Sequence, residues 1–168
     1  MPTSPTAASL LLRLALGPTL AYHGWNKVAG PGGLKGTTGW FEALGLRPAA
    51  VHARMAAATE LGAGVALTVG VASPLPEAAA IGLMAVAART DHRGKGFFVF
   101  KGGWEYTAVV AAAATALAAL GPGAASVDHL VGRDGGTVKR AVGALGLGVG
   151  SAAALLAASY RPTPSAGV

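Results

Sequence analysis

Residues 105–120, EYTAVVAAAATALAAL, form an apolar run whose only charged residue, Glu105, stands at its first position. The sequence Gly121-Pro122-Gly123 follows directly and predicts the end of a helix. Charged residues make up 12% of the 168-residue chain, and its mean hydropathy is +0.52. Soluble domains carry about a quarter charged residues. We therefore expect lipid to surround this helix.

Working outward, four further apolar runs cover residues 6–24, 48–72, 77–89 and 139–160. Two prolines in Ser73-Pro74-Leu75-Pro76 predict a tight turn between the second and third runs. We predict an all-α, polytopic membrane bundle. Residues 1–124 would form four core transmembrane helices, and residues 125–168 a loop, a fifth transmembrane helix and a short disordered tail. An Ala-rich soluble bundle is the alternative, and the lack of a wide polar stripe on four of the runs disfavours it.

Alanine and glycine dominate these runs, and small residues let helix backbones approach closely. We predict that Gly62, Gly64, Gly146 and Gly150 lie at such helix contacts.

All ten aromatic residues fall at one end of the predicted bundle, which we call the aromatic end. They are Tyr22, Trp25, Trp40, Phe41, Phe97, Phe98, Phe100, Trp104, Tyr106 and Tyr160. In the first loop, residues 25–47, Thr37 or Thr38 is expected to cap a short interfacial helix with Trp40, Phe41 and Leu44 on one side. In residues 90–103, glycines, lysines and phenylalanines alternate, which is typical of an interfacial or re-entrant segment.

Two charged residues fall inside the predicted spans. Arg13 lies ten residues before His23, about 15 Å below the aromatic end at 1.5 Å per residue. Glu60 lies twelve residues after Pro48, about 18 Å below that end. Because a charge in the membrane interior needs a partner or a water-filled cavity, we predict that Arg13 and Glu60 interact. The pair would be a proton or anion site, or an ion pair that only fixes the fold.

Titratable side chains gather at the helix ends of the aromatic end, where they could exchange protons with a bound redox-active ring or simply satisfy water and headgroups. We predict proton transfer by His23, Glu60 and Glu105, and ligand contacts by Arg13, Lys27, Trp40, Phe41, Asp91, His92, Trp104 and Tyr106.

Several kinds of chemistry are disfavoured by the sequence. The chain has no cysteine, which excludes disulfides and thiolate sites within it. No HxxxH or ExxH pair occurs within a span, so no metal site is expected. Nucleotide-binding loops and a nucleophile elbow are also missing. The net charge is +6, and the basic residues flank apolar spans. This arrangement favours anionic lipid or an anionic substrate over nucleic acid as a partner.

Four stretches carry a resemblance to a known family. RLALGPTLAYHGWNKV (13–28), GTTGWFEALGL (36–46), ATELGAGVALTVG (58–70) and FFVFKGGWEYTAVV (97–110), in this order, resemble the DoxX family of small bacterial membrane proteins. The resemblance runs from about Leu11 to Gly123 and implies a four-helix membrane bundle. The run after Gly123 departs from that pattern. Positions that match the family are Arg13, His23, Gly24, Lys27, Gly39, Phe41, Glu42, Gly45, Glu60, Gly103, Glu105 and Tyr106.

The resemblance implies a quinone-linked subunit of a membrane oxidoreductase, or of an oxidative-stress or sulfur-handling complex, in the bacterial plasma membrane. Because the chain has no cysteine, haem ligand pair or flavin motif, electron transfer would require a soluble redox partner. The alternative is a non-enzymatic membrane anchor or assembly subunit that recruits a soluble enzyme. A third hypothesis is a small-molecule or anion transporter built on Arg13 and Glu60.

Basic residues are unevenly divided between the two ends of the predicted bundle. Nine lie toward the aromatic end: Lys27, Lys35, Arg47, Arg54, Arg89, Arg93, Lys95, Lys101 and Arg161. Three lie toward the other end: Arg133, Lys139 and Arg140. The excess predicts that the aromatic end is cytoplasmic.

Overall fold

The structure is a computed structural model that describes residues 4–162, and these residues form an all-α fold without a named strand. Its α-helices are α1 (Ser4–Ala29), α2 (Gly33–Ala43), α3 (Ala49–Val69), α4 (Leu75–Thr90), α5 (Glu105–Leu120) and α6 (Val138–Ser159). Two short 3₁₀ helices, η1 (Val99–Lys101) and η2 (Asp128–Val131), lie in the loops on either side of α5. The all-α prediction is confirmed.

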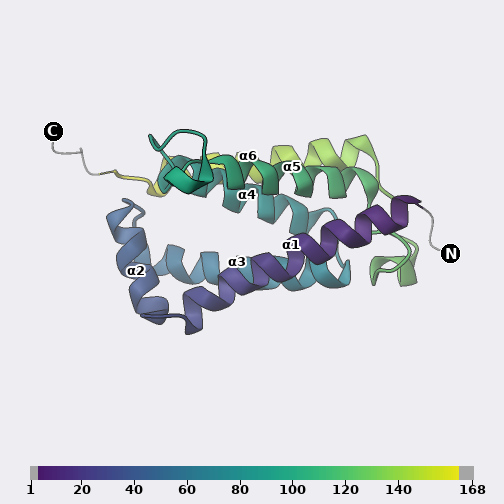
Figure 1. Ribbon diagram of the computed structural model, residues 1–168, viewed down its shortest axis with the longest axis horizontal. Coiled ribbons are helices and arrows are strands. Elements are labelled where there is room, and N and C mark those ends of the chain that lie inside the picture. Colours follow the sequence, from purple (N-terminus) through teal and green to yellow (C-terminus); the bar gives the residue numbers. More distant parts are fainter. Residues whose placement is uncertain (1–3, 163–168) are drawn as a thin grey trace.

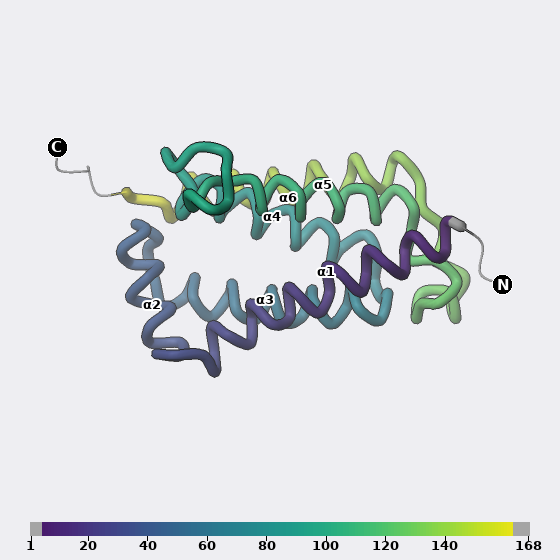
Figure 2. The backbone as a smooth tube through the Cα atoms, viewed as in Figure 1, coloured from purple at the N-terminus to yellow at the C-terminus, as the bar shows by residue number. Residues whose placement is uncertain are grey.

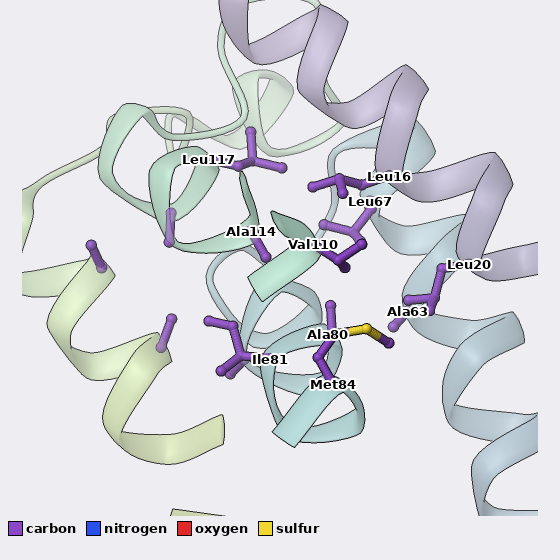
Figure 3. Packing of buried hydrophobic residues seen from close by; sticks show 14 residues of the cluster. Leu16, Leu20, Ala63, Leu67, Ala80, Ile81, Met84, Val110, Ala114 and Leu117 are labelled. Carbon is purple, nitrogen blue, oxygen red and sulfur yellow. The ribbon is translucent and has the colours of Figure 1, made fainter. Parts of the chain in front are cut away.

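The long helices form two groups, as Figure 1 shows: α1 packs along α3, and α4 packs along α5 and α6. Contacts of α1 with α5 and of α3 with α4 join the groups. Between them lies a core of small and aliphatic side chains (Figure 3), among them Leu16, Leu67, Ile81, Val110 and Leu117.

The segments that carry the aromatic residues meet at one end of the molecule, as predicted (Figures 1 and 2). The end of α1, all of α2, the loop between α4 and α5, and the end of α6 lie there. The start of α1 and the loop between α5 and α6 lie at the opposite end.

The first loop is shorter than the sequence predicts, because α1 continues past Gly24 to Ala29 and α2 already begins at Gly33. The prediction that Thr37 or Thr38 caps the short helix is therefore wrong. Gly32, with a left-handed φ of 81°, precedes the helix instead. The Thr37 hydroxyl lies within α2 and donates to the Lys27 carbonyl oxygen at 3.0 Å, which ties α2 to the end of α1.

Helices α1 and α3 approach closely through glycines. A Cβ atom added to Gly64 would lie 2.7 Å from the carbonyl oxygen of Gly17, too close for any real side chain. The prediction for Gly64 is confirmed. The prediction for Gly62 is wrong, because this residue faces outward and an added Cβ would meet no atom within 4 Å.

Helices α4 and α6 meet in the same way, but through Gly148, whose added Cβ would lie 2.6 Å from the Ala78 carbonyl oxygen. The predicted contacts at Gly146 and Gly150 are wrong, since an added Cβ at either residue would meet nothing within 4 Å. The face of α6 that is buried contains Ala141, Ala144, Gly148 and Ala152. Their spacing of three and four residues leaves Gly146 and Gly150 on the outer side.

Among the described helices, α6 is the one whose length and apolar composition suffice to cross a membrane. Only 22% of its 18-residue apolar window is buried inside the protein, unlike the core helix of a soluble protein. Helix α5 is apolar but has 16 residues, about 24 Å of helix. Multiple crossings therefore stay a prediction.

Candidate functional site

A cavity of about 560 Å³ lies at the aromatic end, and all six α-helices contribute to its walls. Most of the wall is aliphatic, with Leu20, Leu83, Met84 and Leu155 among the lining residues. His, Thr, Ser, Lys, Asp and Glu side chains also line it. Small-molecule sites in proteins are typically apolar cavities of roughly 300–1,000 Å³ with a few polar groups. The cavity therefore has the size and character of a ligand site.

The main charged feature of the cavity is an ion pair between Lys27 of α1 and Glu60 of α3. The Lys27 Nζ atom lies 2.8 Å from Glu60 Oε1 and 2.6 Å from Oε2. The side chains are only 12% and 9% exposed. Gly24 makes the pair possible, because a Cβ there would lie 2.7 Å from the Leu61 backbone nitrogen and would push α3 away.

Aromatic rings surround this pair. The Lys27 Nζ atom lies 5.9 Å from the centroid of the Trp40 ring, which packs edge-on against Phe41 at 5.2 Å. On another side, the rings of His23 and Tyr106 have their centroids 6.0 Å apart. The ammonium, the imidazole and the phenol thus face the same cavity. The ammonium can donate a proton, and the imidazole and the phenol can take part in proton transfer.

Further imidazoles line the cavity where it meets the loops. His52, which is buried, donates from Nε2 to the Arg47 carbonyl oxygen at 3.2 Å. His92 donates from Nδ1 to the Gly102 carbonyl oxygen at 2.6 Å. No group of three or more His, Asp or Glu side chains in the described part of the chain is arranged to hold a metal ion.

Eight of the predicted site residues line this single cavity. They are His23, Lys27, Trp40, Phe41, Glu60, Asp91, His92 and Tyr106.

Glu105 and Trp104 do not line the cavity. A Glu105 carboxylate oxygen accepts a hydrogen bond from the Val99 backbone N–H at 2.9 Å and so fixes the loop before α5. The Trp104 ring packs edge-on against Phe97 at 5.0 Å, on the exposed side of that loop.

The predicted interaction between Arg13 and Glu60 is wrong. Arg13 lies in the half of α1 toward the opposite end, 3% exposed. It donates hydrogen bonds to four backbone carbonyl oxygens, those of Leu67 (3.1 Å), Thr68 (2.8 Å), Pro122 (3.0 Å) and Ala125 (2.6 Å). These bonds connect α1 to the end of α3 and to the loop after α5. Arg13 is therefore a structural residue, and it does not contact the cavity.

The error arises from the stagger of α1 and α3. Gly24, which faces Leu61, lies five residues before the end of α1, whereas Leu61 lies twelve residues after the start of α3. Helix α3 therefore projects about 10 Å beyond α1 at the aromatic end. The start of α3 packs against Phe41 of α2 instead. Counting residues from each predicted helix end therefore gave Arg13 and Glu60 similar depths, although the two side chains do not meet.

His52, which the sequence places among the titratable side chains of the aromatic end, lines the cavity from α3. Other lining residues were not predicted as part of the site. They are Thr59 on α3 and Ser151 on α6, together with the apolar Ala152 and Leu155 of α6. A hydroxyl within an apolar run, as at Ser151, is a signal that could have identified α6 as a wall of the cavity. The five-helix pattern did not show which face of α6 turns inward.

The model of the DoxX family matches residues 8–93, more than half of the 168-residue chain. The matched part contains α2, α3, α4 and most of α1, with the ion pair, Trp40, Phe41, Asp91 and His92. Tyr106 and the α6 wall lie outside it. No curated protein and no solved structure matches the chain.

Proposed function

We propose a function for this chain, which belongs to the DoxX family of membrane proteins. The cavity at the aromatic end binds a quinone, and the protein is the quinone-linked subunit of a membrane oxidoreductase. The observation that carries this proposal is the largely buried Lys27–Glu60 pair in the wall of a mainly apolar cavity of about 560 Å³. An apolar ring with polar oxygens at its edge matches that combination.

The residues present suit a quinone. Aliphatic walls can cover the two faces of the ring, while the Lys27 ammonium and the Tyr106 hydroxyl offer hydrogen bonds to its carbonyl oxygens. A bound quinone would supply reversible two-electron, two-proton redox chemistry. The contribution of this chain would be to hold the ring and to provide proton-carrying groups next to it, His23 and Glu60.

Electrons must come from another protein, because the chain has no cysteine and no cofactor motif of its own. We propose a soluble redox enzyme that docks at the aromatic end as that partner. In the alternative, the protein is a membrane anchor that recruits a soluble enzyme, and its cavity binds no quinone.

We infer that α1, α3, α4, α5 and α6 all cross the cytoplasmic membrane of a bacterium. Each exposes large apolar side chains, for example Leu11, Val65, Leu75, Val109 and Val142, which are 56–69% exposed. Such side chains are suited to lipid. Helices α4 and α5 have 16 residues each, shorter than the roughly 20 needed to span the hydrocarbon core. A bilayer accommodates short helices by local thinning.

Thermal unfolding of the purified full chain with a short-chain quinone tests the proposal. Ligand at a hundredfold excess over its dissociation constant stabilises the folded state by about 2.7 kcal/mol, a measurable rise in melting temperature. Lys27→Met and Trp40→Ala should reduce this rise, because both side chains line the cavity. Glu42→Gln is the matched control, since that exposed carboxylate pairs with Arg47 outside the cavity.

If no quinone stabilises the wild-type protein, the redox proposal fails. Recruitment of a soluble enzyme that is unchanged in Lys27→Met and Trp40→Ala would then leave the anchor hypothesis. If a quinone stabilises all variants equally, it binds elsewhere than in this cavity.

A further inference from the structure

We propose that the loop between α4 and α5, residues 91–104, is a preformed binding site for the headgroups of anionic phospholipids at the bilayer surface. Within this loop only Asp91 and His92 line the cavity, whereas its aromatic rings and basic side chains do not. The proposal does not depend on the cavity binding any ligand.

The loop presents a row of four aromatic rings on its outer side. Phe100 stacks on Phe98 at 5.3 Å, Phe98 contacts Phe97 edge-on at 5.5 Å, and Phe97 contacts Trp104 edge-on at 5.0 Å. All four side chains are exposed, and Phe100 is 77% exposed. In water such a row of rings would be an unusual apolar patch. At a bilayer surface it can insert among the upper parts of the acyl chains.

Hydrogen bonds hold the loop in this shape. Glu105 N donates to the Phe97 carbonyl oxygen at 2.9 Å, and Gly103 N donates to that of Phe98, also at 2.9 Å. The Glu105 carboxylate accepts from Val99 N, and His92 fastens Gly102 to the end of α4. The rings are therefore fixed outward instead of folding onto the protein. A surface that is already ordered loses less conformational entropy when it binds.

The charge of the loop fits an anionic surface. Arg93, Lys95 and Lys101 are exposed basic residues among the rings. The one acidic residue of the loop, Asp91, is engaged by Lys95 Nζ at 3.4 Å, and Glu105, directly after the loop, is engaged by the Val99 N–H. Arg93 makes no ion pair or hydrogen bond within the described residues, and the Lys101 ammonium lies 5.9 Å from the Phe100 ring centroid. The cations that remain available match phosphate and other anionic headgroup chemistry.

The position of the loop favours lipid over a protein partner. Tyr22 and Trp25, in the last third of α1, are 70% and 57% exposed. Exposed Tyr and Trp near the end of a spanning helix mark the level of the lipid headgroups. The loop lies at the same end of the molecule (Figures 1 and 2), and the apolar helix α5 begins directly after it.

Native mass spectrometry of the detergent-solubilised full chain, mixed with equal amounts of phosphatidylglycerol and phosphatidylcholine, tests the site. We expect the wild-type protein to retain phosphatidylglycerol preferentially. Arg93→Ser with Lys101→Ser should lower that preference by up to about 25-fold, because each basic residue near an anionic surface strengthens binding about fivefold. Phe98→Ser with Phe100→Ser should weaken retention of both lipids, since the rings contact acyl chains and not headgroups.

The matched control is Arg133→Ser with Lys139→Ser, which removes the same charge from exposed residues at the opposite end. It should keep the preference. An equal loss in the control would mean that net charge alone retains the lipid, and an unchanged preference in Arg93→Ser with Lys101→Ser would overturn the site. Loss of a copurified protein without any change in lipid retention would instead identify the loop as a protein-docking surface. Because these side chains are exposed, unchanged melting temperatures should show that all variants fold.

Discussion

At the scale of single residues, the described part of the chain contains a buried cation, Arg13, and a largely buried one, Lys27, which are stabilised in different ways. Arg13 satisfies its guanidinium with four backbone carbonyl oxygens. Its planar fork of donors can reach several acceptors at once. Lys27 has a single compact ammonium and is neutralised by one carboxylate, that of Glu60. The first arrangement joins segments of the fold, whereas the second leaves a titratable pair beside a cavity.

The Lys27–Glu60 pair should show strong energetic coupling. Lys27→Met leaves a buried carboxylate without its partner, which typically costs about 3–5 kcal/mol of unfolding free energy. Adding Glu60→Gln should restore much of that loss, because the uncompensated charge is then gone. Reversible unfolding in mixed micelles measures the double-mutant cycle.

The exposed pair of Arg47 and Glu42, 53% and 58% exposed, is the control for this cycle. Exposed pairs contribute about 0–1 kcal/mol. Strictly additive losses for Lys27→Met and Glu60→Gln would contradict a direct interaction. The combination of Arg13→Leu with Glu60→Gln should be additive, since those residues do not meet.

At this scale the sequence shows which residues need partners but not which partners they have. The presence of Arg13, Lys27 and Glu60 within or beside apolar runs is visible in the sequence. Their pairing depends on how far α3 slides along α1, and that stagger is set by where Gly17, Gly24 and Gly64 let the backbones touch. Counting residues along a single helix cannot show how far the neighbouring helix is shifted.

At the scale of helices, the fold depends on which glycine of a pair turns toward the neighbour. Gly62 and Gly64 are two residues apart on α3 and so lie on different faces. Gly64→Ala should destabilise the protein by about 1–3 kcal/mol, because the added methyl group collides with α1. Gly62→Ala should be neutral or stabilising by up to about 1 kcal/mol, the difference in helix propensity.

Thermal unfolding followed by circular dichroism compares these two variants on the same helix. Equal melting temperatures for Gly62→Ala and Gly64→Ala would contradict the close approach of α1 and α3. Gly148→Ala and Gly146→Ala on α6 form a second matched pair with the same expected difference.

Helix positions were largely predictable, whereas helix ends and helix faces were not. The apolar runs and the turn around Pro74 and Pro76 are visible without any structure, and α5 has the predicted bounds. The start of α2 was misjudged because Thr37 and Thr38 use their hydroxyls within the helix or toward α1 and do not cap it. The inward faces of Ala- and Gly-rich helices carry almost no hydrophobic contrast, so periodicity could not select them.

At the scale of the whole molecule, the cavity follows from the alternation of helix directions. Antiparallel neighbours bring distant parts of the chain, such as His23, Asp91 and Tyr106, to one end. The sequence therefore predicted eight of the residues that line the cavity as one group at this end. It could not predict that the Glu105 side chain turns to the loop, because that depends on the path of residues 97–103 and its hydrogen bond to Val99 N.

The alternation of helix directions also predicts which parts of the chain lie on opposite sides of the membrane. Lys35 on α2 and Arg133 in the loop after α5 are exposed at opposite ends of the molecule, with α3, α4 and α5 between them. Three crossings would place the two residues on opposite sides of the membrane. Because basic residues concentrate at the aromatic end, we expect Lys35 on the cytoplasmic side.

The native chain has no cysteine, so single cysteines report their positions without background. In intact cells, an impermeant maleimide should label Arg133→Cys and leave Lys35→Cys unlabelled, and permeabilised cells should show both labelled. The reverse pattern would place the aromatic end, with its cavity and its lipid-binding loop, on the outer side of the membrane. Equal labelling of both variants in intact cells would contradict three crossings, because the two residues would then share a side despite the separation of the two ends in the fold.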